Sequence, residues 1–290
     1  MSSDSRSVPL YKRFWTRCST SVSPQTPEEK VQLMINAELA AFPYHRSLEK
    51  IWKIAGGCPE AQWQPACSLA LAVGASLDLP VQSEHGFIYD KETGLTAYVL
   101  ENPSMHEARL IFGGTASGET ARDSNIRTLA NSSFALKQWI ANAQNTLRFD
   151  RPASYLQARA LTAELVFFMA FINQYSTFSL TLSGHSKGGG EATYSALTQN
   201  QPSNAICYAS VELGEKLLTD IPPEHSSKAG DFIIHYLIEG DLIPRVGTLL
   251  PGLKLLGRVV TLPAQRLWDS PLDRHIQFVR HIHHYVNSNK

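Results

Sequence analysis

Five consecutive residues, Gly184-His185-Ser186-Lys187-Gly188, carry the clearest chemical signal in the sequence because they fit the pattern G-x-S-x-G. An alternating segment typical of a strand, residues 178–183, precedes them, and a run of small residues typical of a helix, residues 188–197, follows. Because the flanking glycines have no Cβ, the strand and the helix can approach without collision. The serine between them is then lifted above the sheet edge. The pattern predicts Ser186 as a nucleophile, with a glycine-rich turn holding an incidental serine as the alternative.

A serine nucleophile that forms an oxyanion needs two hydrogen-bond donors about 3 Å from the developing negative charge. We expect these donors to be the backbone N–H groups of Lys187 and Thr115. Lys187 would begin a helix whose N-terminus favours negative charge. Thr115 follows an apolar segment, residues 109–112, that is typical of a buried strand and stops at Gly113-Gly114. An ordinary turn at the end of a strand is the alternative for the glycine pair.

Serine is a weak nucleophile at neutral pH, so a neutral histidine must take its proton and a carboxylate must orient that histidine. We predict Asp241 as the carboxylate, because it directly follows an apolar strand, residues 231–238, and precedes Leu242-Ile243-Pro244. In the strand–turn–helix hydrolases the chain order is serine, acid, histidine. The rival carboxylates, each of which could be an ordinary exposed loop residue, are Glu239, Asp231, Asp269 and Asp273.

Four histidines crowd the C-terminus, namely His275, His281, His283 and His284. We predict His275 as the base, on a loop at the start of a final helix, and the other three stay open as alternatives. His185 is expected to pack beside the nucleophile, and Lys187 to contribute only its backbone. No cysteine or aspartate is expected at ligand spacing from these histidines, so neither a metal nor another cofactor is predicted.

A family resemblance follows from two of these motifs. Gly-His-Ser-Lys-Gly-Gly, at residues 184–189, resembles the elbow of the class 3 (fungal-type) lipases and their bacterial lipase-like relatives. Leu110 to Thr115 is similar to the oxyanion strand of that family, which ends in Arg-Gly-Thr or Arg-Gly-Ser, although Gly113 stands where the arginine usually does. The resemblance covers roughly residues 85–285. It implies an α/β-hydrolase fold, with a mostly parallel central sheet flanked by helices, and hydrolysis of lipid esters.

The elements that must position these residues can be outlined from periodicity. Strands that alternate with helices indicate a mostly parallel sheet. A β-hairpin is expected over residues 87–100, and residues 118–150 could form a lid. The other predicted elements are an opening helix over about 27–42, a second helix near 61–75, a long helix over roughly 152–175, and strands at 205–211, 231–238 and 258–262.

Composition bounds the rest of the chain. With 290 residues and 43% hydrophobic content, one catalytic domain over residues 27–290 is expected, after a Ser-, Pro- and Thr-rich flexible arm over residues 1–26. A basic aromatic island in the arm fits a disordered tail, an interfacial anchor or a targeting segment. The 26 basic residues balance the 26 acidic ones, which argues against nucleic-acid binding. The four scattered cysteines indicate reduced thiols.

The expected function is hydrolysis of a carboxylic ester, with a lipid or another ester as substrate, an acyl glycerol or phospholipid being favoured, and transient contact with a membrane surface. An acyltransferase or thioesterase would use the same triad, and a catalytically silent binding module is the alternative from another class. No signal peptide or transmembrane segment is predicted. The protein is therefore expected in the cytoplasm, or outside the cell through a signal-peptide-independent apparatus, as with some bacterial lipase-like effectors.

Overall fold

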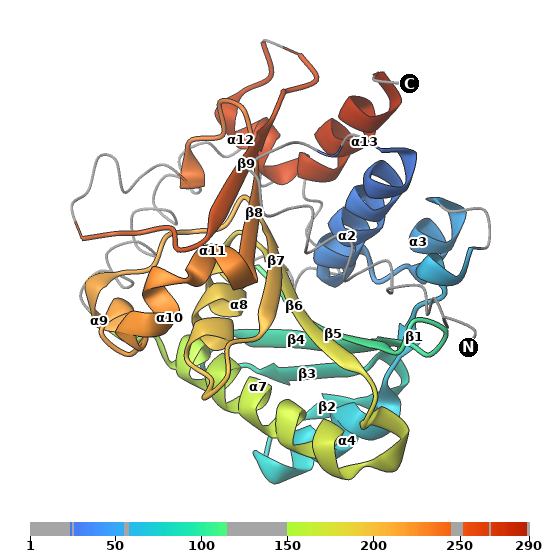
Figure 1. Cartoon of the computed structure of the whole chain (residues 1–290), viewed down its shortest axis with the longest axis vertical. Coiled ribbons are helices and arrows are strands. Elements are labelled where there is room, and N and C mark those ends of the chain that lie inside the picture. Colours follow the sequence, from blue (N-terminus) through green and yellow to red (C-terminus); the bar gives the residue numbers. More distant parts are fainter. Residues whose placement is uncertain are drawn as a thin grey trace, which may run out of the picture.

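The computed structural model describes residues 24, 26–54, 58–114, 150–244, 252–266 and 268–288. Within these residues, helices cover both faces of a central nine-stranded sheet (Figure 1). The prediction for Thr115 lies outside the described residues, as do residues 118–149 of the lid predicted over 118–150 and residues 1–23 of the arm predicted over 1–26.

The sheet combines an antiparallel part and a parallel part. Its strand order is β2-β3-β4-β5-β6-β7-β8-β9, with β1 added beside β4. Neighbouring strands from β5 to β9 pair in parallel, whereas β1 to β5 pair antiparallel. The predicted hydrolase-type sheet, parallel through its centre, is confirmed. The strands are β1 Gln64–Pro65, β2 Val81–Gln82, β3 Phe87–Asp90, β4 Leu95–Asn102, β5 Glu107–Phe112, β6 Ser179–His185, β7 Asn204–Tyr208, β8 Ile233–Ile238 and β9 Arg258–Leu262.

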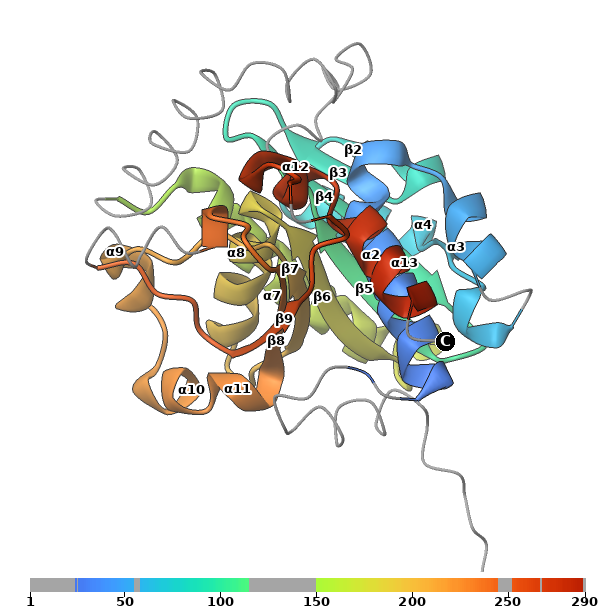
Figure 2. The same ribbon diagram turned by 90° about the horizontal axis from the view of Figure 1, so that it is seen from above.

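Two groups of helices bury the two faces of the sheet. Helices α4, α7 and α8 pack on one face, and α2, α3 and α13 pack on the other, where α2 and α13 lie side by side (Figure 2). The α-helices are α2 Pro27–His45, α3 Leu48–Ile54, α4 Cys67–Ser76, α7 Ala153–Phe171, α8 Lys187–Leu197, α9 Glu215–Leu218, α10 Pro223–Ser227, α11 Ala229–Phe232, α12 Pro271–Ile276 and α13 Phe278–Ser288.

Local chemistry explains where the first helices begin. Thr26 and Glu29 form a capping box, in which each side chain accepts a hydrogen bond from the backbone N–H of the other. The opening helix predicted to end at residue 42 continues to His45. The second predicted helix begins six residues late, at Cys67, because Pro65 cannot occupy a helix interior.

The C-terminal helix differs from its prediction. It is divided at Gln277 into α12 and α13, and Ser270 caps α12 by accepting the N–H of Asp273 at 3.1 Å. His275 therefore lies within α12, near its end, and the prediction that it occupies a loop was wrong. The strand predicted over 231–238 also begins late, because residues 229–232 form the short helix α11.

Parallel register brings three strand ends together at one edge of the sheet. Phe112 of β5 pairs with Gly184 of β6, and Gly184 pairs with Cys207 of β7. The next residue of β7, Tyr208, pairs with Tyr236 of β8. Because carboxyl ends of parallel strands meet at the same edge, the segments after β5, β6 and β8 adjoin there. These segments are the ones that carry Gly113-Gly114, Ser186 and Asp241.

Candidate active site

The turn between β6 and α8 holds Ser186 in a backbone conformation that few side chains adopt. Its φ is 58° and its ψ is −123°. A non-glycine residue at positive φ is strained by about 1 to 3 kcal/mol, and such strain persists only where neighbours over-determine it. Here the Ser186 N–H donates to the Tyr208 carbonyl at 3.1 Å, and the Ser186 carbonyl accepts from the Val211 N–H at 3.2 Å. The strand–turn–helix geometry is that of a nucleophile elbow.

The glycines around the turn are required by close backbone contacts. A Cβ on Gly184 would lie 2.3 Å from the carbonyl carbon and oxygen of Gly188. A Cβ on Gly188 would lie 2.2 Å from the carbonyl oxygen of Phe112. Backbone atoms cannot yield to such contacts as the end of a flexible side chain can. These two glycines therefore let β5, β6 and α8 approach one another.

Asp241 and His275 form a buried hydrogen-bonded pair. His275 Nδ1 lies 3.0 Å from Asp241 Oδ2, and the two residues are 3% and 1% exposed. The second carboxylate oxygen of Asp241 accepts the N–H of Ile243 at 3.0 Å. Since the carboxylate takes the hydrogen on Nδ1, the lone pair of neutral His275 is on Nε2. That nitrogen is the one left for proton transfer.

The turn that presents Asp241 is tied to the helix that presents His275. Gly240 has a φ of 78°, and a Cβ there would collide with the guanidinium of Arg274. Arg274 Nη1 donates to the carbonyl oxygen of Glu239 at 2.9 Å. Arg274, directly before His275, thus binds the turn that precedes Asp241. This contact fixes the position of His275 relative to Asp241.

Lys187 contributes through its side chain as well as through its backbone, which the sequence did not reveal. Its backbone N–H stands in the first turn of α8, where no intrahelical acceptor exists, as an oxyanion donor requires. Its side chain, expected to be idle, forms an ion pair with the buried Glu191 and donates to the Gly94 carbonyl at 3.3 Å. Burial raises the pKa of Glu191, and the ammonium group of Lys187 opposes that shift. The side chain fastens the elbow helix to the β3–β4 hairpin.

The rival acids and histidines lie elsewhere. Asp231 is in α11 and is exposed, and Glu239 is exposed at the start of its turn. His284 is exposed near the end of α13, and His283 lies 3.2 Å from Glu38 of α2. Of the four C-terminal histidines, His275 is the one that the described hydrogen bonds join to Asp241.

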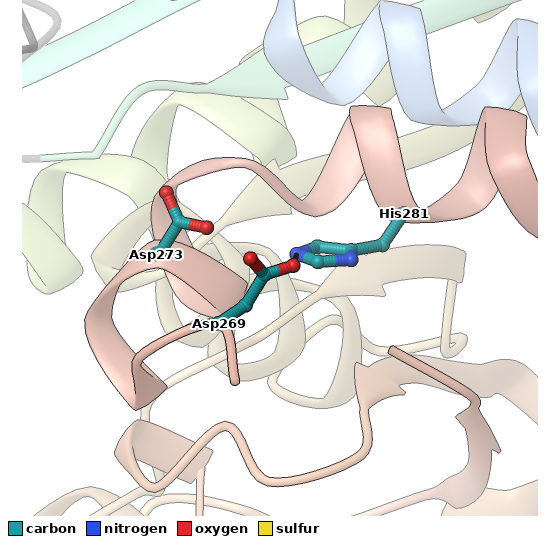
Figure 3. A group of neighbouring side chains, drawn as sticks. All are labelled: Asp269, Asp273 and His281. Carbon is teal, nitrogen blue, oxygen red and sulfur yellow. Dashed lines mark ion pairs between the residues drawn. The ribbon is translucent and has the colours of Figure 1, made fainter. Parts of the chain in front are cut away.

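A group of metal-ligand type does gather at the α12–α13 corner, contrary to the expectation that no aspartate lies beside these histidines. One ligand atom from each of Asp269, Asp273 and His281 falls within 4.8 Å of the others. Figure 3 shows the three side chains gathered at this corner. Folding the chain at Gln277 brings the loop before α12 against α13, so sequence spacing did not reveal this proximity.

Two contacts argue that this corner is an ion-pair cluster. His281 Nδ1 accepts the backbone N–H of Gln265 at 2.9 Å, so the ring hydrogen of neutral His281 must be on Nε2, the nitrogen that faces Asp269. A metal ligand needs a free lone pair there. Arg280 Nη2 lies 2.7 Å from Asp273 Oδ2 and 3.2 Å from Asp269 Oδ2, which already supplies a cation. The residues do not fit a metal centre.

Comparisons with known proteins show the fold. No protein-family model and no curated protein matches the chain. A deletion mutant of the Rhizomucor miehei lipase propeptide complex has a TM-score of 0.50 and 15% identity, over 88% of this chain and 79% of that one. The native complex has a TM-score of 0.49, with 18% identity over 84% and 73% of the two chains. Lipase II from Rhizopus niveus has a TM-score of 0.44, with 15% identity over 79% and 78%.

The chain has an α/β-hydrolase fold, which it shares with the first of these lipases. At 15% identity the likeness extends to the fold and carries no statement about the reaction. In the part of the chain that the structure describes, no helix is both long enough and apolar enough to span a bilayer.

Proposed function

We propose that this protein is a serine hydrolase that cleaves carboxylic esters through an acyl-Ser186 intermediate, with Asp241 and His275 completing the triad. The observation that carries the proposal is the buried hydrogen bond of 3.0 Å between His275 and Asp241, beside the strained turn that presents Ser186. The two are joined by His185, directly before Ser186, whose Nε2 lies 2.9 Å from the carbonyl oxygen of His275. The strand–turn–helix around Ser186 fits this class, as does the order of serine, acid and histidine along the chain.

In the proposed reaction, Ser186 Oγ attacks the ester carbonyl carbon while His275 Nε2 takes the hydroxyl proton. Asp241 stabilises the resulting imidazolium. His275 then returns the proton to the departing alcohol oxygen as the C–O bond breaks, which leaves the acyl group on Ser186. A water molecule, deprotonated by His275, then attacks the acyl carbon. As the bond between the acyl carbon and Ser186 Oγ breaks, His275 returns that proton to Oγ, which releases the acid and regenerates the free serine.

The oxyanion in each tetrahedral intermediate needs donors on the side of the elbow. We assign one to the backbone N–H of Lys187 and the other to that of Thr115, which follows the described end of β5. Loss of one such donor raises the barrier by about 3 to 4 kcal/mol. The close approach of Gly188 to Phe112 supports the assignment, because it places the start of α8 beside the end of β5.

A lipid ester is the substrate class we favour, an acyl glycerol or a phospholipid. Two exposed apolar side chains on the active edge of the sheet support contact with a lipid surface. Leu242, directly after Asp241, is 58% exposed, and Trp268, in the segment from β9 to α12, is 80% exposed. An exposed tryptophan suits the boundary between apolar chains and headgroups.

A fluorophosphonate probe tests the proposal, because it reacts with activated serines. The wild type should be labelled, and Ser186→Ala should abolish labelling. Asp241→Asn and His275→Ala should each lower kcat by about 10⁴-fold. His284→Ala is the matched control, since it removes an exposed histidine from the next helix, and its kcat should equal that of the wild type. Activity that survives His275→Ala but not His281→Ala would overturn the assignment of the base.

Substrate and acceptor are resolved by a second experiment. A panel of esters with different chain lengths and headgroups, assayed on the wild type and on Ser186→Ala, identifies the acyl and alcohol parts that the site accepts. Added alcohol acceptors distinguish hydrolysis from acyl transfer, because only a transferase forms the new ester. Thioester substrates in the same panel test thioester cleavage. A folded wild type that neither labels nor turns over any ester would instead indicate a binding module.

A further inference from the structure

His185, the residue before the proposed nucleophile, is held by contacts from three helices. Its Nδ1 lies 2.9 Å from the hydroxyl oxygen of Tyr44 in α2, and its Nε2 lies 2.9 Å from the carbonyl oxygen of His275 in α12. Its ring stacks on Phe278 of α13, with centroids 4.4 Å apart and planes 9° apart. Both ring nitrogens are therefore occupied, which makes His185 more than a space-filling elbow residue.

The chemistry of the partners fixes the direction of these hydrogen bonds. A carbonyl oxygen only accepts, so His185 Nε2 must carry a hydrogen and donate it to His275. In the neutral ring Nδ1 then has a lone pair, and the Tyr44 hydroxyl must donate to it. Burial lowers the pKa of His185 well below its ordinary value, and the neighbouring His275 lowers it further, so His185 remains neutral.

The network continues to the end of β5. The backbone N–H of Gly114 donates to the hydroxyl oxygen of Tyr44. A Cβ on Gly114 would lie 2.2 Å from that oxygen and 3.2 Å from the carbonyl oxygen of His185, so a glycine is needed for the approach. Donors and acceptors thus run in one direction from Gly114 through Tyr44 and His185 to His275, an arrangement in which each bond polarises the next.

We infer that Tyr44 and His185 are positioning residues, which set the oxyanion strand end, the elbow and the backbone of His275 at the mutual distances that catalysis needs. The inference rests on the proposed function, because it takes His275 as the base. Neither residue is proposed to touch the substrate. Displacing a catalytic group by about 1 Å can cost on the order of 100-fold in rate.

Tyr44→Phe is the direct test, because it removes the hydroxyl and keeps the ring. We expect kcat for a soluble ester to fall by about 10-fold to 100-fold, with KM unchanged. Tyr194→Phe is the matched control. It also removes a hydroxyl from a buried tyrosine, one that donates to Asp220 at 2.9 Å and lies outside the network, and kcat should remain near that of the wild type. Equal kcat values for the two folded variants would overturn the inference.

Replacement of His185 gives an independent test that does not depend on Tyr44→Phe folding. Glutamine can place an amide N–H near the position of Nε2 and donate to the His275 carbonyl, whereas leucine cannot. Both lose the ring that stacks on Phe278. His185→Gln should therefore retain at least about 10-fold more kcat than His185→Leu. Equal losses would show that packing, and not the hydrogen bond, is what His185 contributes, which would overturn its positioning role.

The outcome for the proposed function is read separately. If the wild type fails to react with the fluorophosphonate probe, the proposed function fails, whatever these variants do. If the wild type reacts and Ser186→Ala does not, the proposed function stands, and the Tyr44 and His185 variants then decide the positioning inference. Thermal unfolding of every variant establishes that the kcat values compare folded proteins.

Discussion

At the scale of single residues, the candidate site depends on glycines that have no Cβ as much as on the side chains proposed to react. The strained Ser186 backbone is held by hydrogen bonds to β7 and its loop, and Gly184 and Gly188 leave room for the carbonyls that pass beside them. A methyl group at either glycine would meet backbone, which can move only if the elbow moves. The elbow is thus sterically determined over a few residues.

Gly184→Ala tests that requirement. Its Cβ would lie 2.3 Å from the Gly188 carbonyl, so we expect the free energy of unfolding to fall by about 2 to 3 kcal/mol, as for other overpacked sites. Gly230→Ala in α11 is the control, because its Cβ would meet only the Arg258 side chain, at 3.3 Å. That change should leave stability the same or raise it by about 0.4 to 1 kcal/mol. Urea unfolding measures both, and similar losses would contradict the steric account.

At the scale of elements, a buried carboxylate joins the first helix to the last. Glu38 of α2 lies between His45 at the end of the same helix, at 3.1 Å, and His283 of α13, at 3.2 Å. The Ser47 N–H donates to His45 Nδ1 at 3.0 Å, so His45 Nε2 carries the hydrogen that reaches Glu38. Burial raises the pKa of Glu38, but the hydrogen bonds from His283 and His45, together with the charge that these rings carry when protonated, outweigh it and lower the pKa from 4.5 to about 2.

Glu38→Gln should therefore destabilise the fold in a pH-dependent manner. The pKa of Glu38 is lower in the folded state, so the charged carboxylate stabilises the fold above pH 4.5, and this stabilisation is lost as the pH falls toward 2. At pH 7 we expect the variant to lose about 2 to 3 kcal/mol of unfolding free energy. The difference from the wild type should shrink steadily below pH 4.5. Urea unfolding at several pH values measures it, and a pH-independent difference would contradict the account.

At the scale of the whole molecule, exposed aromatic side chains lie at both edges of the sheet. Trp268 lies on the edge where the carboxyl ends of β5 to β9 carry the candidate site. Phe171, 70% exposed, ends α7 and lies toward the opposite edge, from which β6 starts. If lipid contact serves the reaction, the two side chains should differ in their effects, although both are large and exposed.

Trp268→Ser should lower binding to phospholipid vesicles and turnover of emulsified ester by about 10-fold, while leaving turnover of a soluble short-chain ester unchanged. Phe171→Ser is the control and should change none of these quantities. Vesicle sedimentation and parallel assays on the two substrate forms measure the effects. Equal vesicle binding by the two variants would remove the support for a lipid surface at this edge.

Much of the fold followed from local patterns. The hairpin, the strand over 258–262 and the strand–turn–helix around Ser186 were predicted where they occur, because alternation and glycine clearance act between near neighbours in the chain. The predicted ends of helices were less accurate where a single residue determines the position of the end. Pro65 delayed α4, and the break at Gln277 placed His275 in a helix.

The sequence by itself determined the elbow with its serine, a set of acids and histidines, and the parallel sheet that would carry them. Tertiary structure decided which of those side chains meet. His275 reaches Asp241 across 34 residues of chain, and Tyr44 reaches His185 across 141. No local pattern marks Tyr44, because the contact arises from packing α2 against the sheet. Sterics within a turn are fixed by adjacent residues, whereas convergence of distant side chains depends on how helices pack on the sheet.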